Sequence, residues 1–405
     1  MAQGTARQYR VIVVGCGAVG AATAYWLSRR LGGGVLALEQ YQHGHTRGAS
    51  EDHSRVIRHA YSRPEYTALT PAAYQAWNVA ERETGLQLVY RTGGLIIAED
   101  GSAGAAYLAA AADAMDTANL PYEQLTGVEV AERWPQWRLG AEHVALRDPE
   151  SGILDIRRGT AAHLAMALDR GATVLAGTEV TAINESAGGV TVTAGGQEYR
   201  GGQVVLAGGA WNPLLLAMLG GGDGDSARLP ITLTEEQVTY FATAKVSLFT
   251  PDRFGVFGYL ADDGLYYGFP VYGEVGVKIG IDGAGPVVTP ETRTWARDEA
   301  RVGRVLAFLE RYLPDAVGPE LYTRSCCYDF PPDRDFIVDY VPGSQRVLVC
   351  AGAGHAGKFA GLLGRVLSEL ALDGASRFPV AAFSATRPAL SGADGAVVTG
   401  RVNSM

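Results

Sequence analysis

The sequence lacks a long apolar run, a block of basic residues and a cysteine spacing suited to a metal ion. No stretch of about 18 apolar residues occurs, and the polar residues 1–10 lead directly into an apolar strand, so we expect neither a membrane span nor a signal peptide. Acidic residues outnumber basic ones 43 to 34 and no basic run occurs, so the charge gives no electrostatic footprint for nucleic acid or an anionic membrane. These absences predict a cytoplasmic protein with no nucleic-acid partner and no membrane partner.

Cysteine is also scarce. The four thiols are Cys16, Cys326, Cys327 and Cys350, and their spacing fits neither a metal site nor the disulfide framework of a small secreted domain. Reduced thiols are therefore the default expectation, and no metal is expected. The adjacent pair at positions 326 and 327 calls for a separate explanation.

The most informative motif that is present is the glycine-rich turn GCGAVG at residues 15–20, which follows the apolar run at residues 11–14 and opens a helix-like stretch. Gly15 permits a tight turn, Gly17 lets the backbone approach a pyrophosphate, and Gly20 lets helix and strand pack closely. The helix N-terminus adds free N–H groups and a positive dipole end. A glycine-rich turn without a ligand is the alternative, but the preceding strand and the acid that follows favour a dinucleotide.

That acid is Glu39, which ends the apolar strand at residues 35–38 and can accept hydrogen bonds from ribose hydroxyls. A 2′-phosphate would call for an arginine, so NAD or FAD is predicted rather than NADP. A second glycine turn, with Gly208 and Trp211, follows the apolar strand at residues 203–207. Such a turn close to a dinucleotide is typical of FAD domains and favours FAD, although an ordinary connection remains the alternative.

Segments with the character of a nucleotide-binding domain alternate with other segments along the 405 residues, which are too many for one hydrophobic core. We expect helices at about 105–118, 157–170, 290–313 and 358–372, strands at 94–98 and 172–175, a small meander at 180–192 and antiparallel sheet at 229–281. The predicted fold class is α/β. Residues 1–83, 151–222 and 320–390 are assigned to a Rossmann-like FAD-binding domain, residues 84–150 and 223–319 to an α+β substrate domain with a mainly antiparallel sheet, and residues 391–405 to a polar tail.

Six short segments occur in an order that points to a known family: SRVIRHAY at 54–61, YYGFP at 266–270, GVKIG at 276–280, CCYDFPPDRDFIVD at 326–339, HAGKF at 355–359 and RPAL at 387–390. Through them, from about Tyr9 to Leu390, the chain resembles the monomeric sarcosine oxidase family of FAD-dependent amine oxidases. That family includes N-methyltryptophan oxidase and pipecolate oxidase and lies within the D-amino-acid oxidase fold group.

The resemblance implies that Cys326 is joined by a thioether to the 8-methyl carbon of the flavin. Counting back without a gap from residues 336–339 leads to Cys326 and not to Cys327. A thiolate can make that bond, and the link is expected to raise the flavin potential because the methyl group becomes less electron-donating. Two small buried thiols without a covalent role are the alternative.

The resemblance assigns Lys278 to oxygen activation, as a fixed cation near flavin N5 that stabilises superoxide. An oxidase is therefore predicted rather than a dehydrogenase. Lys278 lies in an otherwise apolar strand, where burial of an ammonium has a large free-energy cost, so a lysine at this position indicates a functional role. The alternative places it on the solvent face of an edge strand. The resemblance also places Arg55 near the flavin, where its charge would favour the anionic reduced ring.

Arg58 and Lys358 are expected, by the same resemblance, to hold a substrate carboxylate, since arginine offers a planar fork and lysine a compact charge. Their joint presence implies an amino-acid substrate rather than a simple amine. Tyr267 and Tyr328 match aromatic residues that border the substrate cavity. The alternatives are surface ion pairs for the two cations and core packing for the two tyrosines.

Two departures from the family pattern bear on the substrate. Residues 50–53, SEDH, lack the expected flavin-facing histidine, whose hydrogen bond Glu51 or His53 could replace. Asp282 stands where the family has a histidine, four residues after Lys278. An acid beside the carboxylate site disfavours small N-methyl amino acids such as sarcosine, unless the acid is protonated or meets a cationic substrate.

The predicted activity is FAD-dependent oxidation of a secondary or cyclic α-amino acid. Hydride passes from the C–H next to the neutral amine to flavin N5, and O2 then reoxidises the flavin, giving an imine and H2O2. Three alternatives stay open: a biosynthetic enzyme that desaturates a ring amino acid or imine, a dehydrogenase that passes electrons to a protein, and a noncatalytic flavin-binding module. We expect a monomer or homodimer whose partners are the amino acid and O2.

The predicted catalytic residues are Arg58, Tyr267, Lys278, Asp282, Tyr328 and Lys358. The predicted cofactor contacts are Gly15, Gly17, Ala18, Val19, Gly20, Glu39, Gln40, Ser54, Arg55, Val180, Gly208, Trp211, Cys326, Gly354, His355, Gly357 and Lys358.

Overall fold

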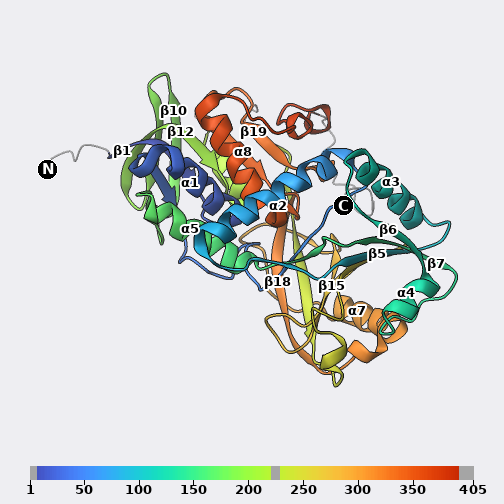
Figure 1. The fold of residues 1–405 in the computed structure, drawn as a ribbon. Helices are drawn as coiled ribbons and strands as arrows, with labels where there is room; N and C mark the ends of the chain where they lie inside the picture. The colour runs from blue at the N-terminus through green and yellow to red at the C-terminus, as the bar shows by residue number, and fades with distance from the viewer. Residues whose placement is uncertain (1–6, 220–228, 392–405) are drawn as a thin grey trace.

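A computed structural model describes residues 7–219 and 229–391 of the chain. It contains two large sheets, one in the half that carries the N-terminal strand and one in the other half, with helices packed on both (Figure 1). No helix of the described residues is both long and apolar enough to cross a membrane.

The first sheet has eight strands in the order β10-β11-β12-β1-β2-β9, with β20 beside β12 and β19 beside β20. Its strands are β1 (Arg7–Val14), β2 (Val35–Leu38), β9 (Thr173–Leu175), β10 (Val180–Ser186), β11 (Gly189–Ala194), β12 (Gln197–Leu206), β19 (Ile337–Tyr340) and β20 (Val347–Ala351). The strands β1, β2, β9, β12 and β20 are parallel. Early, middle and late parts of the chain therefore share one parallel core.

Helices cover this first sheet because its central strands are apolar on both faces. Alternate residues of β1 enter two separate core clusters, and all of residues 11–14 are buried. The covering helices are α1 (Ala18–Leu31), α2 (Pro64–Thr84), α5 (Ile156–Asp169), α6 (Asn212–Ala217) and α8 (Ala360–Asp373). In Figure 1, α1, α5 and α8 lie together over the N-terminal strands.

The second sheet has nine strands in the order β17-β13-β16-β15-β14-β5-β7-β6, with β18 beside β13. Its strands are β5 (Gly94–Glu99), β6 (Glu123–Thr126), β7 (His143–Asp148), β13 (Thr232–Phe241), β14 (Val256–Ala261), β15 (Gly264–Phe269), β16 (Val277–Asp282), β17 (Val287–Val288) and β18 (Glu320–Phe330). Neighbours are antiparallel except β5 and β14. The antiparallel character expected for residues 229–281 is thus present.

Two helices pack against opposite faces of the second sheet, α3 (Ala103–Thr117) against one and α7 (Glu299–Tyr312) against the other. The short helix α4 (Gly127–Arg133) follows β6. A small antiparallel sheet of β3 (Arg55–Ile57), β8 (Gly152–Leu154) and β4 (Val89–Arg91) completes the strands. Short 3-10 turns occur at Gly32–Gly34, Gly209–Trp211, Val246–Leu248, Pro314–Ala316, Ala356–Phe359, Ala381–Phe383 and Pro388–Leu390.

Two expected helices begin later than the sequence indicated. The helix expected over 290–313 begins at Glu299, because the Asp298 carboxylate caps the backbone N–H of Arg301 and Pro290 precedes an irregular stretch. The helix expected from Lys358 begins at Ala360, because Lys358 lies in the 3-10 turn Ala356–Phe359.

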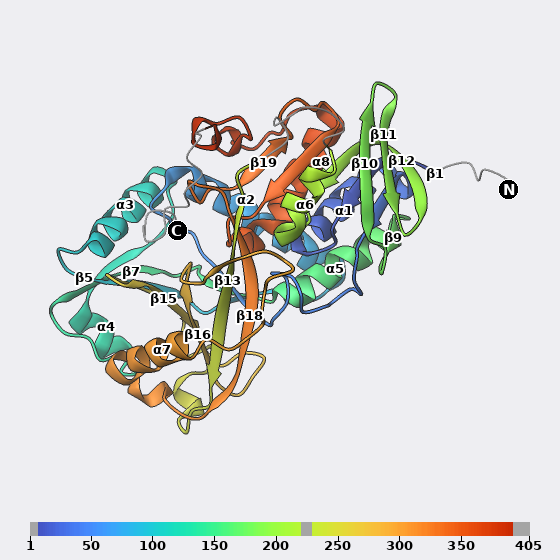
Figure 2. The ribbon, with the colours of Figure 1, turned by 180° about the vertical axis from the view of Figure 1, so that it is seen from behind.

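One strand also crosses the predicted division of the chain. The range 320–390 was assigned to the FAD-binding domain, yet β18 at its start pairs with β13 along the second sheet. Figure 2 shows these two long strands side by side. The division into domains by residue range stays a prediction. The expected tail lies outside the described residues except for Ser391.

Candidate active site

A cavity of about 470 Å³ lies where the two sheets meet, a volume within the range of small-molecule sites. Segments that are distant in the sequence line it: the first glycine turn, residues 48–58, the turn after β12, the strands β15, β16 and β18, and the turn after β20. Of the predicted site residues, all line the cavity except Gly20. Gly20 was predicted to contact the cofactor, but it packs against the turn instead. A Cβ at Gly20 would clash with the carbonyl oxygen of Gly15, so this glycine allows the helix to pack on the strand.

The first glycine turn leaves the N-terminus of α1 open. Gly15 has φ +94°, and a Cβ on it would lie 2.5 Å from the carbonyl oxygen of Ala207. Gly17 precedes the helix and supplies no side-chain cap, while the backbone N–H of Ala18 donates to Ser50 Oγ at 2.8 Å. Backbone N–H groups of the first turn of α1 therefore face the cavity with no acidic side chain among them.

Glu39 lies at the end of β2, where the sequence placed it. Its carboxylate accepts hydrogen bonds from the backbone N–H groups of Cys16 at 2.9 Å and Tyr41 at 3.0 Å. Burial raises the pKa of Glu39, but these bonds and the nearby His45 outweigh burial and hold the pKa below its usual range. A charged acceptor thus stands beside the glycine turn.

Two residues that sequence reasoning missed fix the other turns. Asn212 accepts from the backbone N–H of Gly208 at 2.9 Å and donates to the carbonyl of Cys350 at 2.7 Å, which ties the turn after β12 to the end of β20. The Asp329 carboxylate accepts from the N–H of Gly352 at 2.8 Å. Burial raises the pKa of Asp329 to about 6, although hydrogen bonds from the backbone N–H groups of Gly352 and Gly354 oppose this increase. The sequence signal that could have identified Asn212 and Asp329 is that polar residues close to a glycine turn often hydrogen-bond its backbone.

The strand β16 alternates strictly, and this alternation faces its polar residues into the cavity. Val277, Ile279 and Ile281 enter the core cluster that includes α7, whereas Lys278 and Asp282 line the cavity. Gly280 lies between them and directly opposite Tyr267 of β15. A Cβ on Gly280 would lie 3.0 Å from the Tyr267 hydroxyl oxygen, so the glycine makes room for that ring.

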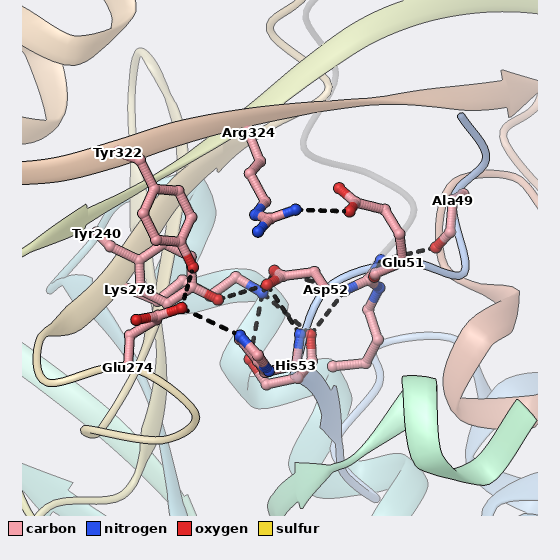
Figure 3. Close-up of polar contacts among 11 residues, drawn as sticks. Ala49, Glu51, Asp52, His53, Tyr240, Glu274, Lys278, Tyr322 and Arg324 are labelled. Atoms are coloured by element: carbon pink, nitrogen blue, oxygen red, sulfur yellow. Dashed lines mark hydrogen bonds and ion pairs between the residues drawn. The ribbon is translucent and has the colours of Figure 1, made fainter. Parts of the chain in front are cut away.

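Lys278 is almost fully buried, with 2% exposure. Its ammonium donates to the carbonyl oxygen of Ser54 at 3.0 Å and to Ser54 Oγ at 3.2 Å, and it forms an ion pair with Asp52 (Figure 3). This burial contradicts the alternative of a solvent-facing edge position. The sequence offered no sign that Asp52 would be its partner, because the two residues are brought together only by the fold.

Arg58 and Lys358 lie against the same aromatic ring, that of Tyr61. The guanidinium carbon of Arg58 lies 4.6 Å and the Lys358 nitrogen 5.6 Å from the centroid of that ring. Burial, with the adjacent charge of Arg58, lowers the pKa of Lys358 to about 7. Neither cation has an acidic partner in hydrogen-bond contact among the described residues, so this part of the cavity is prepared for an anion.

Asp282 is the acid nearest to these cations. Its carboxylate lies 3.4 Å from the guanidinium of Arg334, which does not line the cavity. Burial raises the pKa of Asp282, while Arg334, Lys358 and Arg58 oppose the increase. Asp282 therefore brings an acid to the end of the cavity that carries these cations.

Tyr267, Tyr328 and His355 complete the cavity wall near Asp282. Burial raises the pKa of Tyr267 above its usual range and lowers that of His355, so both side chains are neutral near pH 7. His355 Nδ1 lies 2.7 Å from the carbonyl oxygen of Ala353. A Cβ on Gly354 would meet the ring of Tyr328, so the glycine turn and the tyrosine are in close contact.

The two adjacent cysteines of β18 point to opposite faces of the strand. Cys326 lines the cavity, whereas Cys327 is 3% exposed and packs in a cluster with Ala210 and Leu233. Burial raises the pKa of Cys326 to about 12, and Arg55 opposes this increase. The thiol that faces the cavity is thus the one selected by counting along the sequence.

The two candidates for replacing the missing histidine lie in different places. Glu51 lines the cavity and pairs with Arg324 at 3.1 Å, whereas His53 does not line it and lies 3.3 Å from Glu274 Oε1 (Figure 3). Arg55 donates to the carbonyl oxygens of Ala49, Glu51 and Ser54 and so braces this loop. Of the two candidates, only Glu51 faces the site.

These features suit a dinucleotide of the FAD type. The open N-terminus of α1 fits a pyrophosphate, Gly17 lets it approach, and the ionised Glu39 fits a ribose. At the far end of the cavity, Arg58 Nε and His355 Nε2 are buried without a hydrogen-bond partner among the described residues. Buried polar atoms of this kind usually find a partner, so a bound molecule is the natural one.

Comparison with known proteins agrees with this geometry. A model of the family described as FAD dependent oxidoreductase matches residues 10–370. The monomeric sarcosine oxidase of Bacillus sp. (strain B-0618) is 31% identical over 389 residues, which cover 94% of this chain and 97% of that protein. The N-methyl-L-tryptophan oxidase of Escherichia coli O157:H7 is 30% identical over 386 residues, covering 94% and 99%.

Solved structures show the same fold. NikD, an unusual amino acid oxidase essential for nikkomycin biosynthesis, aligns with a TM-score of 0.80 and 27% identity over 93% of this chain and 97% of its own. An L-proline dehydrogenase from P. horikoshii aligns with a TM-score of 0.81 and 20% identity over 94% and 97%. The predicted fold class is therefore confirmed.

Proposed function

Because the chain belongs to the family of FAD-dependent oxidoreductases and is itself an FAD-dependent amine or amino-acid oxidoreductase, we propose that it is an oxidase of a secondary or cyclic α-amino acid. The observation that carries this proposal is the pair of cations, Arg58 and Lys358, at one end of the cavity. The planar guanidinium of Arg58 and the compact ammonium of Lys358 together suit a carboxylate, a group that a simple amine lacks.

When bound, FAD supplies the redox chemistry, in which the amine loses a hydride from carbon and a proton from nitrogen to become an imine, and O2 is reduced to H2O2. The residues of the chain bind and orient the reactants. Arg58 and Lys358 hold the carboxylate, and Tyr267 and Tyr328 confine the amine. Lys278 provides the fixed positive charge that favours electron transfer to O2. Positioning and electrostatics carry most of the rate in such a site, and no general base is needed once the amine is neutral.

We extend the proposal to a covalent link between Cys326 and FAD. Support comes from the direction of the thiol, which faces the cavity, and from Arg55, whose charge favours the thiolate against the effect of burial. The test is acid precipitation of the purified protein. Yellow colour that stays in the pellet, and is lost in Cys326→Ala but kept in Cys327→Ala, supports the link. Colour released to the supernatant contradicts it and leaves a noncovalent FAD enzyme.

The oxidase activity itself is tested by a peroxide-coupled screen of secondary and cyclic amino acids, each paired with the matching amine that lacks the carboxylate. We expect H2O2 from amino acids and little from the matching amines. Peroxide from the amines at equal efficiency would contradict the carboxylate site. Flavin reduction without peroxide would favour a dehydrogenase instead.

A second candidate function is desaturation of a ring amino acid or imine in a biosynthetic pathway. Asp282 favours it, because an acid beside the cations suits a substrate with an additional hydrogen-bond donor or positive charge. The likeness to NikD points in the same direction. Isolation of an aromatic or doubly unsaturated product, rather than a single imine, would establish this alternative.

A further inference from the structure

Lys278 is held by a short segment that precedes β3 and is distant in the sequence, since Ser54 lies 224 residues before Lys278. Among the residues that the structure describes, the hydrogen-bond acceptors that it contacts all belong to residues 52–54. They are the carbonyl and hydroxyl oxygens of Ser54 and the carboxylate of Asp52 (Figure 3). Asp52 is itself only 5% exposed. An ion pair in such a site is screened very little by water.

Asp52 is in turn aimed by its own contacts. Its Oδ1 accepts from the Tyr240 hydroxyl at 2.6 Å and from the backbone N–H of His53 at 2.8 Å. Tyr240 of β13 lies directly opposite Lys278 of β16 in the strand register. The tyrosine that orients the carboxylate and the lysine that pairs with it therefore stand side by side on one face of the sheet.

The backbone at Asp52 also marks this residue as unusual. Its φ of +77° lies in the left-handed region that favours glycine, although aspartate tolerates this region better than most residues. The conformation turns the carboxylate inward, where it meets Lys278 and Tyr240. A strained position that presents a charged group to the cavity wall is consistent with a functional role.

We propose that Asp52 is a positioning residue whose carboxylate keeps the ammonium of Lys278 protonated and fixed beside the cavity. The inference rests on the proposed oxidase function, in which the charge of Lys278 assists the reduction of O2. It adds a residue that controls that charge. Asp52 acts through Lys278 and is not required to touch the substrate.

The groups that surround Lys278 show why its charge needs support. Burial lowers the pKa of Lys278, Asp52 raises it, and Arg55 lowers it again. The nearby thiol of Cys326 raises the pKa of Lys278. The centroids of the Phe269 and Tyr240 rings lie 4.6 and 5.8 Å from the Lys278 nitrogen.

Asp52 faces further charged and titratable groups besides Lys278: Arg55, Arg324, Glu51 and Tyr322. Burial raises the pKa of Asp52, but Lys278 and Arg55 outweigh burial and hold the pKa well below its usual range. Asp52 is therefore ionised throughout the working pH range. Without it, Lys278 would be a buried cation beside Arg55, with no other acid of the described residues in contact.

The scarcity of lysine makes a direct test possible. The chain contains three lysines, Lys245, Lys278 and Lys358. Lysine labelled with 13C at Cε therefore gives three NMR resonances from the FAD-loaded enzyme, and Lys278→Met assigns the relevant one. Lys245, whose side chain is 57% exposed, serves as the internal reference.

We expect Lys278 in Asp52→Asn to titrate about one pH unit or more below its value in the wild type, since the nearest counter-charge is gone. Asp335→Asn is the matched control, because Asp335 is a buried acid paired with Arg63 and does not line the cavity. That variant should leave the titration of Lys278 unchanged. If Asp52→Asn fails to fold, Tyr240→Phe, which removes the bond that orients the carboxylate, should lower the value in the same direction.

A second measurement links the ion pair to O2. The rate constant for reoxidation of the reduced enzyme should fall with rising pH in Asp52→Asn at a lower pH than in the wild type, because the ammonium exists only below its pKa. Equal titration of Lys278 in the wild type and Asp52→Asn overturns the inference, whatever the turnover. Failure to oxidise any amine overturns the proposed function instead, since the NMR titration needs no substrate.

Discussion

Arg58 and Lys358, which come from near the two ends of the chain, lie against the same buried ring, that of Tyr61, at distances of 4.6 and 5.6 Å from its centroid. Arg58 follows β3, and the backbone carbonyl of Lys358 accepts a hydrogen bond from the indole of Trp77 in α2 at 2.8 Å. Two basic side chains are thereby held together, and no acid among the described residues is in contact with either of them. Holding two basic groups close together is unfavourable by itself, and the negative charge of a bound carboxylate offsets that cost.

The carboxylate site predicts unequal effects of two substitutions at one position. Arg58→Lys keeps a charge but loses the planar fork, and we expect kcat/KM for the amino-acid substrate to fall roughly tenfold. Arg58→Met removes the charge as well, and a fall of roughly a hundredfold or more is expected. Steady-state peroxide assays measure both. For the matching amine without a carboxylate, the two variants should behave like the wild type; a comparable loss there would rule out the assigned role.

The lowered pKa of Lys358, at about 7, predicts a pH dependence of anion binding. The ammonium is present below that pKa and is lost as pH rises through it. Binding of acetate to the oxidised enzyme, followed by the flavin spectrum, should therefore weaken between about pH 6 and pH 8. Lys358→Met should bind acetate weakly at every pH in this window. A titration that keeps the same midpoint in Lys358→Met would show that another group is responsible.

Asp282 should shift that midpoint, since its charge raises the pKa of Lys358. In Asp282→Asn, acetate binding should weaken at lower pH than in the wild type, while the affinity for acetate at low pH should be equal or higher because the acid is gone. The measurement is the same flavin titration. An upward shift of the midpoint would contradict the electrostatic assignment of Asp282.

Gly15 offers a test of the first glycine turn with a matched control. Gly15→Ala combines a left-handed backbone with a Cβ 2.5 Å from the Ala207 carbonyl oxygen, and we expect a loss of roughly 2–4 kcal/mol in unfolding free energy. Gly85→Ala has a similar backbone, with φ +72°, but open space around the new Cβ, and should lose about 1 kcal/mol. Denaturant unfolding compares the two. Equal losses would mean that the contact with Ala207 is unimportant.

Asn212 should matter for cofactor retention although it does not line the cavity. Asn212→Ala leaves the N–H of Gly208 and the carbonyl of Cys350 without their partner, at a cost of about 1–3 kcal/mol. We expect a lower FAD content if the flavin is noncovalent, or a less stable flavoprotein if it is linked. Asn184→Ala, at an exposed position, is the control. Unchanged flavin content and melting temperature in Asn212→Ala would refute this role.

The sequence predicted those parts of the site that depend on short local patterns. The turn at residues 15–20 and Glu39 were legible because a strand, three spaced glycines and an acid have fixed positions in a βαβ unit. Lys278 was recognisable as a lysine in an otherwise apolar strand, but its place beside the cavity, like that of Asp282, came from the resemblance. Resemblance, rather than periodicity, supplied Arg58, Cys326 and Lys358. Location in the cytoplasm, the oligomeric state and the covalent link remain predictions.

Other features could not be predicted because they depend on which distant segments meet. The strand β18 joins the second sheet through its pairing with β13, a choice that no local signal encodes. The helix α7 begins at Glu299 because Asp298 caps it. The residues before Asp298 are compatible with a helix, so the sequence predicted an earlier start. Asn212 and Asp329 were missed for the same reason, since their partners lie across the turn or in another strand.

The sequence by itself determined the class of ligand, because a dinucleotide site follows from the spacing of glycines and an acid within one βαβ unit. It also showed a lysine in an otherwise apolar strand, whose role came from the resemblance. Only the tertiary structure decided what charge accompanies that lysine. Asp52 and Lys278 are far apart in the chain, and the left-handed backbone at Asp52 cannot be inferred from its neighbours. Their pairing arises where the two sheets meet, because burial there makes a charge without a counter-charge costly.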